Sequence, residues 1–355
     1  MFPDARPLFL LTLVSVLMAT HAMGETAQPS LLNLSPLSSG TEASLRGIAA
    51  CDAKTVWISG TGGTVRRSAN GGESWENVAP DGTEELDFRD LQCLGGGHLL
   101  AMSVGPGESS RIYKTKDHGK TWRLVLQNKQ EAAFFNGLAL WDNENGLLTS
   151  DPIDGKPYLF KTEDGGESWQ RVGQNLPALK DGEYGFAASG TLITVAAGGH
   201  AWLVTGGAVA RIFHSANGGV DWEVYDTPIR DGASSAGIFS AAFRDDKRGV
   251  IVGGDYQKPE LSEKNVAWTA DGGKSWKLAE TDKEGMPQKA CVQHLGDGHY
   301  LAAGRTGLAL STDDGYRWQT VSKESYYTMA WDEASGVGYL AGADGRVARF
   351  QQAQE

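Results

Sequence analysis

Short apolar segments alternate with turns rich in Gly, Asn and Asp along most of the chain. RGIAAC, TVWISG and TVRRS are separated by such turns and followed by WENV, and the next stretch repeats the arrangement as FRDLQC, HLLAMS, RIYKT and WRLV. Runs of this length and composition predict short strands, and four strands joined by tight turns predict an antiparallel meander. The chain is therefore expected to be all-β.

An eight-residue box recurs between the third and fourth predicted strands. It reads Ser/Thr, any, Asp/Asn, any, Gly, any, often Ser/Thr, Trp. The copies are SANGGESW (68–75), TKDHGKTW (115–122), TEDGGESW (162–169), SANGGVDW (215–222), TADGGKSW (269–276) and STDDGYRW (311–318). Similarity at a period of roughly 40–50 residues is the signature of a repeat array or propeller. A box repeated at near-regular spacing indicates architecture rather than a binding loop.

The residue types of the box suit a hairpin. The Asp or Asn side chain accepts backbone N–H bonds within the turn, Gly supplies a positive φ, and Trp buries its ring against the sheet. After the sixth box, SYYTMAWD, VGYLAGA and RVARF supply three further strands, and LLNLSPL (31–37) is a spare strand before the first unit. Pairing the two ends removes an exposed edge. We therefore predict a seven-bladed β-propeller whose last blade is completed by the N-terminal strand.

Composition and charge exclude several classes. The chain has 355 residues, 40 % of them hydrophobic, with 47 Gly and a formal net charge of −12. Without a run of Lys and Arg, no nucleic-acid partner is expected. LFLLTLVSVLMA (8–19) is an apolar core followed by small residues, which predicts a signal peptide over 1–24, with an uncleaved anchor as the alternative. A single domain (25–355), periplasmic or secreted and without a transmembrane segment after signal removal, follows from that interpretation.

The cysteines leave at least one free thiol, because Cys51, Cys93 and Cys291 are an odd number. Cys51 and Cys93 occupy similar places in neighbouring units. Packed sheets lie about 10 Å apart, which exceeds the Cα spacing of a disulfide. Two or three buried thiols are therefore favoured over a bridge.

The candidate motifs for cofactor and metal binding lack residues that such sites require. HGKTW and GGKSW contain the GK[ST] tail of a phosphate-binding loop, but Lys114 and Trp268 stand where its first glycine is required. No GxGxxG opens a βαβ unit, and the histidines show no HExxH or paired spacing. We expect no cofactor and no metal.

The boxes resemble the Asp-box, or bacterial neuraminidase, repeat. From about residue 44 to 350 the chain resembles the exported photosystem II stability/assembly-factor-like propellers. A branch of that family found outside photosynthetic organisms is similar to this chain in five stretches: SDPIDGKP (150–157), FAASGT (186–191), TGGAVARIF (205–213), IFSAAFRDD (238–246) and GGDYQKP (253–259). The resemblance implies a non-catalytic factor that binds a protein partner. It also implies a basic surface patch, for which this acidic chain shows no equivalent.

Candidate site residues lie where innermost strands start and where second strands turn into third ones, because both places share one face of a blade. The strand starts supply Arg46, Arg89, Asp90, Asn136, Phe186, Ser240, Tyr326 and Tyr327. The loops supply Asp151, Asp154, Lys156, Asp255, Tyr256, Lys258, Glu260 and Arg305. DPIDGKP and DYQKPELSEKN are long, polar loops, and loops on a rigid scaffold tend to carry function. We expect both to line a shared funnel. Strand capping or turn formation is the structural alternative for each residue.

Two functions fit these features. The first is a non-catalytic, extracytoplasmic assembly or stability factor that binds a protein or peptide in the cell envelope. The second is a carbohydrate-active or carbohydrate-binding propeller. Glycoside hydrolysis needs two carboxyl groups roughly 5–9.5 Å apart, for which Asp151, Asp154, Asp255 and Glu260 are candidates. Tyr326 and Tyr327 suit stacking on a sugar, whereas the Arg-Ile-Pro segment of sialidases is absent.

Overall fold

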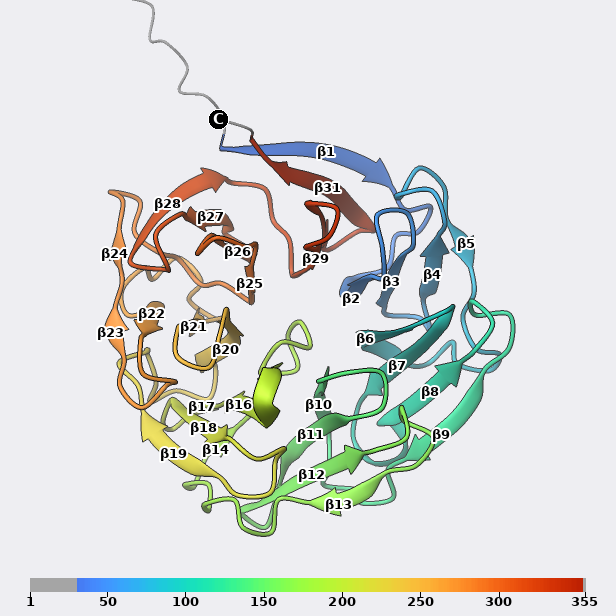
Figure 1. The fold of residues 1–355 in the computed structure, drawn as a ribbon, viewed down its shortest axis with the longest axis horizontal. Helices are drawn as coiled ribbons and strands as arrows, with labels where there is room; N and C mark the ends of the chain where they lie inside the picture. Colours follow the sequence, from blue (N-terminus) through green and yellow to red (C-terminus); the bar gives the residue numbers. More distant parts are fainter. Residues whose placement is uncertain (1–30, 354–355) are drawn as a thin grey trace, which may run out of the picture. The chain divides into compact units, whose positions relative to one another are not determined.

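The computed structural model describes residues 31–353, which form seven sheets arranged as blades around a central axis (Figure 1). The strands of each blade are given from the axis outward. Blade 1 consists of β2 (Leu45–Ala50), β3 (Val56–Gly60), β4 (Val65–Ser68) and β5 (Glu76–Asn77), and blade 2 of β6 (Asp87–Gly95), β7 (His98–Val104), β8 (Arg111–Thr115) and β9 (Arg123–Gln127). Blade 3 consists of β10 (Phe135–Leu140), β11 (Gly146–Ile153), β12 (Lys156–Thr162) and β13 (Gln170–Val172). Blade 4 consists of β15 (Ile193–Ala196), β16 (His200–Val204), β18 (Arg211–Ser215) and β19 (Glu223–Asp226), and blade 5 of β20 (Ala236–Phe243), β21 (Gly249–Asp255), β22 (Val266–Thr269) and β23 (Lys277–Leu278). Blade 6 consists of β25 (Cys291–His294), β26 (Tyr300–Gly304), β27 (Gly307–Ser311) and β28 (Arg317–Ser322). The predicted all-β, seven-bladed propeller is confirmed.

Short extra elements decorate the regular blades. β14 (Glu183–Tyr184) and β17 (Gly206–Gly207) extend the sheet of blade 5, and β24 (Glu280–Thr281) pairs in parallel with β28. Two single-turn 3₁₀ helices, η1 (Gly107–Ser109) and η2 (Ala197–Gly199), lie between strands. None of the helices in residues 31–353 has the length and apolar character needed to span a bilayer.

The two ends of the chain meet in blade 7, as the sequence predicts. Its strands are β29 (Thr328–Asp332), β30 (Val337–Ala341), β31 (Arg346–Gln352) and, outermost, β1 (Leu32–Ser38). β1 runs antiparallel to β31 in unbroken register, from Leu32 opposite Gln352 to Ser38 opposite Arg346 (Figure 1). Leu32 is 4 % exposed and belongs to the same apolar cluster as Phe350. The N-terminal strand therefore closes the ring both by hydrogen bonding and by burial.

Each repeated box forms the turn between the third and fourth strands of its blade. In blade 2, Thr115 Oγ1 donates to Asp117 Oδ1 at 2.9 Å and accepts the N–H of Gly119 at 2.9 Å, while Asp117 Oδ1 also accepts the N–H of Thr121 at 2.9 Å. Gly119 has φ 83°, and a Cβ there would lie 2.8 Å from the Cβ of Val78 in blade 1. Glycine is thus needed both for the turn and for close contact with the preceding blade.

The tryptophans that end the boxes are less uniformly buried than predicted. Trp222 and Trp318 are 6 % and 3 % exposed, whereas the other four are half-buried against the edge of the ring. Trp202 of β16, outside the boxes, is fully buried between two blades: it stacks on Phe243 of blade 5 at 3.7 Å and donates from Nε1 to the carbonyl of Gly272 at 2.8 Å. That contact fastens blade 4 to the box of blade 5.

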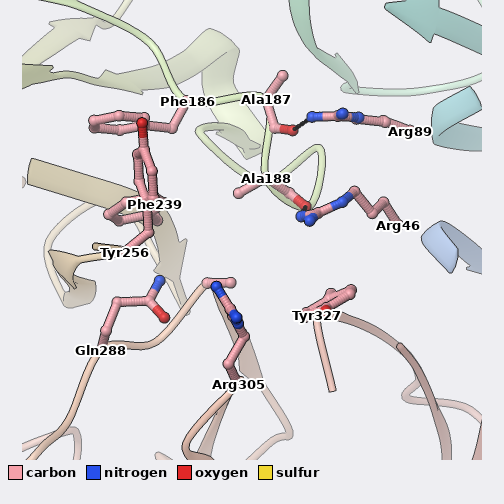
Figure 2. Close-up of a pocket in the computed structure, with 11 residues that line it drawn as sticks. Arg46, Arg89, Phe186, Ala187, Ala188, Phe239, Tyr256, Gln288, Arg305 and Tyr327 are labelled. Carbon is pink, nitrogen blue, oxygen red and sulfur yellow. Dashed lines mark hydrogen bonds between the residues drawn. The ribbon is translucent and has the colours of Figure 1, made fainter. Parts of the chain in front are cut away.

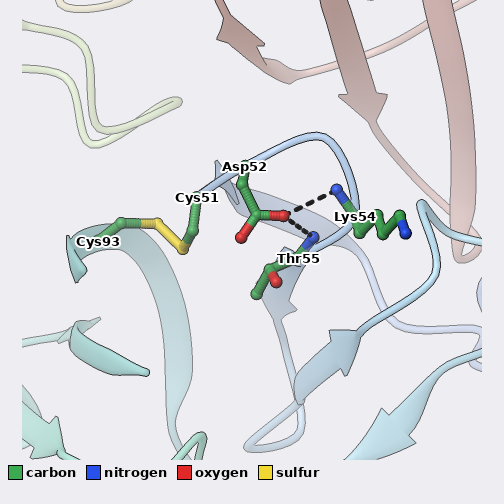
Figure 3. Close-up of a disulfide and its surroundings, with 5 residues drawn as sticks. All are labelled: Cys51, Asp52, Lys54, Thr55 and Cys93. Atoms are coloured by element: carbon green, nitrogen blue, oxygen red, sulfur yellow. Dashed lines mark hydrogen bonds between the residues drawn. A yellow bond between two sulfur atoms is a disulfide. The ribbon is translucent and has the colours of Figure 1, made fainter. Parts of the chain in front are cut away.

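The preference for free thiols at Cys51 and Cys93 is wrong. These residues form a disulfide with a Cα–Cα distance of 5.6 Å (Figure 3). Cys51 directly follows β2 and Cys93 lies in β6, the innermost strands of blades 1 and 2. Because blades converge toward the axis, the sheet spacing of about 10 Å used in the sequence argument does not apply there. Cys291 is the free, buried cysteine.

The predicted signal peptide (1–24) lies outside the described residues.

Candidate functional site

Four innermost strands carry a β-bulge in their first half. The pairing register shifts by one residue at Arg46 in β2, Arg89 in β6, Asn136 in β10 and Phe239 in β20. A bulge leaves one residue unpaired and turns its side chain away from the regular alternation. Figure 2 shows the side chains of Arg46, Arg89 and Phe239 directed into one hollow at the mouth of the ring. A recurring backbone irregularity therefore builds this site.

The segment 186–191 closes the centre of the ring, and we call it the plug. The sequence places Phe186 at the start of a strand, but the innermost strand of blade 4 begins only at Ile193, so that placement is wrong. Arg89 Nη1 donates to the carbonyl of Ala187 at 2.8 Å, and Arg46 Nη1 donates to that of Ala188 at 3.4 Å (Figure 2). The plug thus forms the floor on which the pocket rests.

The remainder of the plug is held by polar contacts with other blades. Ser189 Oγ donates to the carbonyl of Ala290 in the segment before β25 at 2.9 Å, and the hydroxyls of Thr191 and Ser240 are 2.7 Å apart. Gly190 has φ 77°, and a Cβ there would approach the Asp90 carboxyl to 2.6 Å. The plug is therefore ordered by contacts with several blades.

The pocket above the plug has a volume of about 310 Å³. Its lining residues are Arg46, Arg89, Phe186, Ala187, Ala188, Phe239, Tyr256, Gln288, Ala290, Arg305 and Tyr327. Six of them, Arg46, Arg89, Phe186, Tyr256, Arg305 and Tyr327, are among the residues predicted from the sequence. The structure brings these six together, while their role in binding stays a prediction.

One wall of the pocket is aromatic. The rings of Phe186 and Phe239 stack at 4.3 Å with an interplanar angle of 14°, and Tyr256 meets Phe186 edge-on at 6.2 Å. Tyr184 extends the group by an edge contact with Phe186 at 5.4 Å. Tyr256 is 42 % exposed and forms the rim (Figure 2). This wall offers an apolar surface for one ring or a large aliphatic group.

The facing wall carries arginines that differ in their partners. Arg89 is neutralised by Asp87, with Nη2 and Oδ2 at 2.7 Å. Arg46 and Arg305 form no ion pair with any residue in 31–353; the Arg46 guanidinium carbon lies 4.4 Å from the Tyr327 ring centre. Burial and the neighbouring guanidinium of Arg89 lower the pKa of Arg46. Two cations without a counter-ion create a local positive potential.

This arginine cluster corrects the expectation that the chain lacks a basic surface patch. Arg46, Arg89 and Arg305 come from blades 1, 2 and 6, so no sequence window contains two of them. A formal net charge of −12 describes the whole surface and says little about one concave spot.

Gln288 adds the only amide side chain among the pocket residues. It is 2 % exposed, and its Oε1 has no hydrogen-bond partner within the described part of the chain. Its backbone is fixed, because Gln288 N donates to the Pro259 carbonyl at 3.0 Å and Thr306 Oγ1 donates to the Gln288 carbonyl at 2.9 Å. An unpaired buried acceptor is costly unless a ligand supplies an N–H or O–H.

Several predicted residues lie under or beside the pocket rather than in it. Asp90 is buried below the plug and accepts the N–H of Leu138 at 2.8 Å; burial raises its pKa to about 7. Asn136 Nδ2 donates to Asp151 Oδ1 at 2.9 Å, and burial raises the pKa of Asp151 to about 6. These side chains support the bases of blades 2 and 3.

The two long loops do not form a shared funnel. DPIDGKP is largely an extension of the β11–β12 hairpin, paired from Ile153 to Lys156 with Asp154 at the tip, φ 53°. Lys156 is exposed and does not line the pocket. The Asp-Gly turn satisfies the hairpin geometry, which explains the polar residues without a ligand.

The second loop reaches the pocket only through Tyr256. Asp255 is buried, and its Oδ1 accepts the N–H of Gln257 at 2.9 Å, while Lys258 and Glu260 are exposed outside the pocket. Ser240 lies in the plug contact described above. Tyr326 is 1 % exposed in the core of blades 6 and 7, so it cannot stack on a sugar.

Sequence reasoning missed Phe239, Ala187, Ala188, Gln288 and Ala290. Phe239 has a detectable signal. The starts of the innermost strands share the pattern apolar, variable, small or polar: Leu45-Arg46-Gly47, Phe88-Arg89-Asp90, Phe135-Asn136-Gly137, Ile238-Phe239-Ser240 and Tyr326-Tyr327-Thr328. The middle residue lines the pocket in four of these triplets, and Asn136 is the exception, so Phe239 and Tyr327, rather than Ser240 and Tyr326, are the corresponding positions.

No group of three or more His, Cys, Asp or Glu side chains in residues 31–353 is arranged to hold a metal ion.

Comparison with known proteins agrees with this architecture. No family model matches the chain. The chain is 26 % identical over 257 residues to the photosystem II assembly lipoprotein Ycf48 of Synechococcus sp. (strain CC9902), an alignment covering 72 % of this chain and 67 % of the relative.

Solved structures share the fold over nearly the whole described chain. A structure of YCF48 bound to D1 peptide covers 90 % of this chain and 97 % of its own, with 16 % identity and a TM-score of 0.64. The structure of YCF48 from Cyanidioschyzon merolae covers 90 % of this chain and 98 % of its own, with 18 % identity and a TM-score of 0.65. The WD40 propeller domain of Doa1 also matches, with a TM-score of 0.60 at 13 % identity, covering 91 % of this chain and 98 % of the domain.

The assignment to a branch outside photosynthetic organisms stays a prediction. In sequence and in fold the chain is thus similar to the photosystem II assembly factors, as the repeated boxes predict, and its fold is that of a seven-bladed β-propeller.

Proposed function

We propose that this chain is a non-catalytic, extracytoplasmic propeller that binds a partner protein by holding a peptide segment of it in the mouth pocket. The observation that carries this proposal is the pairing of Arg46 and Arg305, which lack counter-ions within residues 31–353, with the aromatic wall opposite them. A pocket with cations on one side and rings on the other suits a flexible segment that carries both an anionic and an apolar group.

The lining also argues against hydrolysis of sugars. No Asp or Glu is among the residues that line the pocket, and the nearby carboxylate of Asp87 is engaged by Arg89. A pair of carboxyl groups flanking a glycosidic bond is therefore not available at this place. The aromatic wall alone does not favour a sugar over a peptide.

The related propellers support a peptide ligand. The relative in Synechococcus is an assembly protein of photosystem II, and one solved YCF48 structure is bound to D1 peptide. For the present chain we propose the same class of partner, a protein, and leave its identity to the capture experiment below.

The proposed location outside the cytoplasm has two supports. The Cys51–Cys93 disulfide is a type of bond that persists in oxidising compartments. The apolar segment at residues 8–19 has the length and following small residues of an export signal.

Capture of the partner tests the proposal. Tagged full-length protein is crosslinked in its native envelope fraction, and recovered proteins are identified by mass spectrometry. The test variant combines Arg46→Gln and Arg305→Gln. The matched control is Lys129→Gln, which removes one positive charge at an exposed position outside the pocket.

We expect one specific protein with the wild type and with Lys129→Gln, and at least about tenfold less of it with the double variant, because hydrogen bonds to charged groups contribute about 1.5–3 kcal/mol each. Equal recovery with the double variant, or no specific protein with the wild type, contradicts the proposal.

A further inference from the structure

The pocket is closed at its base. The carbonyls of Ala187 and Ala188 are bonded to Arg89 and Arg46, so the plug forms the pocket floor where a propeller channel would otherwise continue (Figure 2). Its volume of about 310 Å³ is at the lower limit of ligand pockets. A chain therefore cannot thread through the centre of the ring. The space suits the end of a chain, or one inserted side chain, rather than a folded element.

The positive charge of the pocket favours binding of an anionic group. Neither Arg46 nor Arg305 has an acidic partner anywhere in residues 31–353, although acidic residues outnumber basic ones by 44 to 32 in the whole chain. Arg46 is half-buried and contacts Tyr327 through its flat face, which leaves guanidinium N–H groups directed at the hollow. Planar guanidinium groups recognise carboxylates with paired hydrogen bonds.

Gln288 shows that an anion alone is not sufficient. Its Oε1 is an acceptor, is buried and has no donor within the described chain, so the ligand must present an N–H or O–H close to the anionic group. A fully ionised phosphate or sulfate offers neither. The last residue of a polypeptide offers both, because its carboxylate and its amide N–H are attached to the same Cα.

The aromatic wall accounts for the remaining space. Phe186 and Phe239 present stacked rings, and Tyr256 stands edge-on at the rim. An aromatic ring placed there gains both burial and ring contacts, worth about 0.5–1.5 kcal/mol beyond the area term. Positions for a carboxylate, an N–H and a ring thus surround one small hollow.

We propose that the pocket receives the C-terminal residue of the partner chain, and that this residue is aromatic. The carboxylate lies between Arg46 and Arg305, the amide N–H of the same residue donates to Gln288 Oε1, and the ring packs on Phe186 and Phe239. This inference rests on the proposed function, which requires only that some segment of the partner binds here.

The experiment uses purified chain and peptides displayed with free C-termini. A random library is selected on the immobilised wild type and, in parallel, on the Arg46→Gln/Arg305→Gln variant. We expect Phe, Tyr or Trp to be enriched at the last position on the wild type only. The most enriched sequence is then synthesised with a free carboxylate and as its C-terminal amide, and both are titrated by fluorescence anisotropy.

Amidation removes the negative charge, so we expect at least a tenfold weaker Kd. Gln288→Leu removes the acceptor without changing charge and is expected to weaken binding of the free acid about three- to tenfold. Replacement of the last residue by Ala should weaken binding by a similar factor. Lys129→Gln should leave the Kd unchanged.

Three results overturn the inference. The first is that Phe, Tyr and Trp are no more enriched at the last peptide position on the wild type than on the arginine variant. The second is enrichment of acidic residues at internal positions of the peptides. The third is equal affinity of the wild type for the free-acid peptide and for its C-terminal amide. If the envelope experiment still recovers a partner through the arginine pair, these results remove the C-terminal residue as the ligand and leave the proposed function standing. If no partner is recovered either, both fail.

Discussion

The two sides of the propeller are built on opposite rules. On the side of the repeated boxes, Thr115, Asp117 and Thr121 satisfy one another within a single turn, and equivalent bonds recur in the other boxes. On the side of the mouth, Arg46 and Arg305 lack counter-ions and Gln288 Oε1 lacks a donor within the described residues. Polar groups that form hydrogen bonds within their own turn stabilise the fold, whereas polar groups that lack partners in a pocket are available to bind a ligand.

The same strands carry both sides, which explains how one repeat separates stability from binding. Antiparallel strands alternate direction, so the start of an innermost strand and the box of its blade lie at opposite ends. The bulges at Arg46, Arg89, Asn136 and Phe239 lie in the half of each strand that is nearer the mouth, although β6 has a second register shift near its other end. Substitutions on the two sides should therefore change different measured quantities.

The largest expected effect is on stability and comes from the box side. Trp202 is fully buried, stacked on Phe243 and bonded to Gly272, so Trp202→Ala should lower the free energy of unfolding by about 3–5 kcal/mol. Tyr256→Ala at the mouth should cost less than about 1 kcal/mol, because that ring is 42 % exposed. Denaturant titration of both variants measures the difference. Equal losses would mean that the mouth ring is also part of the core.

The disulfide should have the next largest effect. It joins residues separated by 42 positions, and removing such a bridge typically costs about 2–4 kcal/mol. Cys51→Ser/Cys93→Ser should therefore unfold at lower denaturant concentration. A reductant should shift the wild type toward the variant and leave the variant unchanged. A wild type that is insensitive to reductant would contradict a stabilising role.

Acidification should affect the two sides with opposite sign. On the mouth side, burial raises the pKa of Asp90 to about 7, above its unfolded value of about 3.9. The native state then holds the proton that the unfolded state has released. The contribution of Asp90 is therefore complete below about pH 4 and is lost as the pH rises to 7, by up to about 1.4 kcal/mol per pH unit. Asp90→Asn should gain stability relative to the wild type over that range.

On the box side, burial and the neighbouring His200 lower the pKa of His214 to about 4, from about 6.5 when unfolded. Here the unfolded state takes up the proton first, so stability is lost as the pH falls from 6.5 to 4. His214→Phe should therefore gain relative to the wild type on acidification. Unfolding titrations at several pH values measure both differences, and slopes of the same sign for the two variants would contradict the contrast.

The smallest expected effect is on stability and comes from the arginines. Arg46→Gln/Arg305→Gln should change the free energy of unfolding by no more than about 0.5 kcal/mol, since neither side chain is in an ion pair within residues 31–353 and relief of like-charge repulsion offsets the weak bond to Ala188. Thermal unfolding provides the measurement. A loss above about 2 kcal/mol would assign these residues to the fold instead of to a ligand.

The architecture was predictable because its determinants are local. The box contains its own hydrogen-bond partners, and its regular spacing predicts blades, so the count of seven and the closure by residues 31–37 follow from the printed sequence. The disulfide was not predictable by the same reasoning. It depends on how closely innermost strands converge, and a pattern along the chain does not specify that distance.

The pocket was predictable only in part. Arg46, Arg89, Arg305 and Tyr327 were found because strand starts and second-to-third loops share a face. The sequence does not reveal the plug, because Phe186 resembles the start of an innermost strand. It does not reveal Gln288 either, because only the folded structure shows that its side-chain oxygen is buried without a hydrogen-bond donor in the described residues. Net charge also misled, since it averages over a surface on which three distant arginines converge.

The most direct test of the account asks which side touches the partner. A photoreactive amino acid is placed at Tyr256 on the mouth or at Tyr316 in the sixth box, two tyrosines with 42 % and 38 % exposure. Both proteins are irradiated in the native envelope fraction. The account predicts a partner adduct from position 256 and little or none from position 316. An adduct of equal or greater yield from position 316 would place binding on the box side and contradict the account.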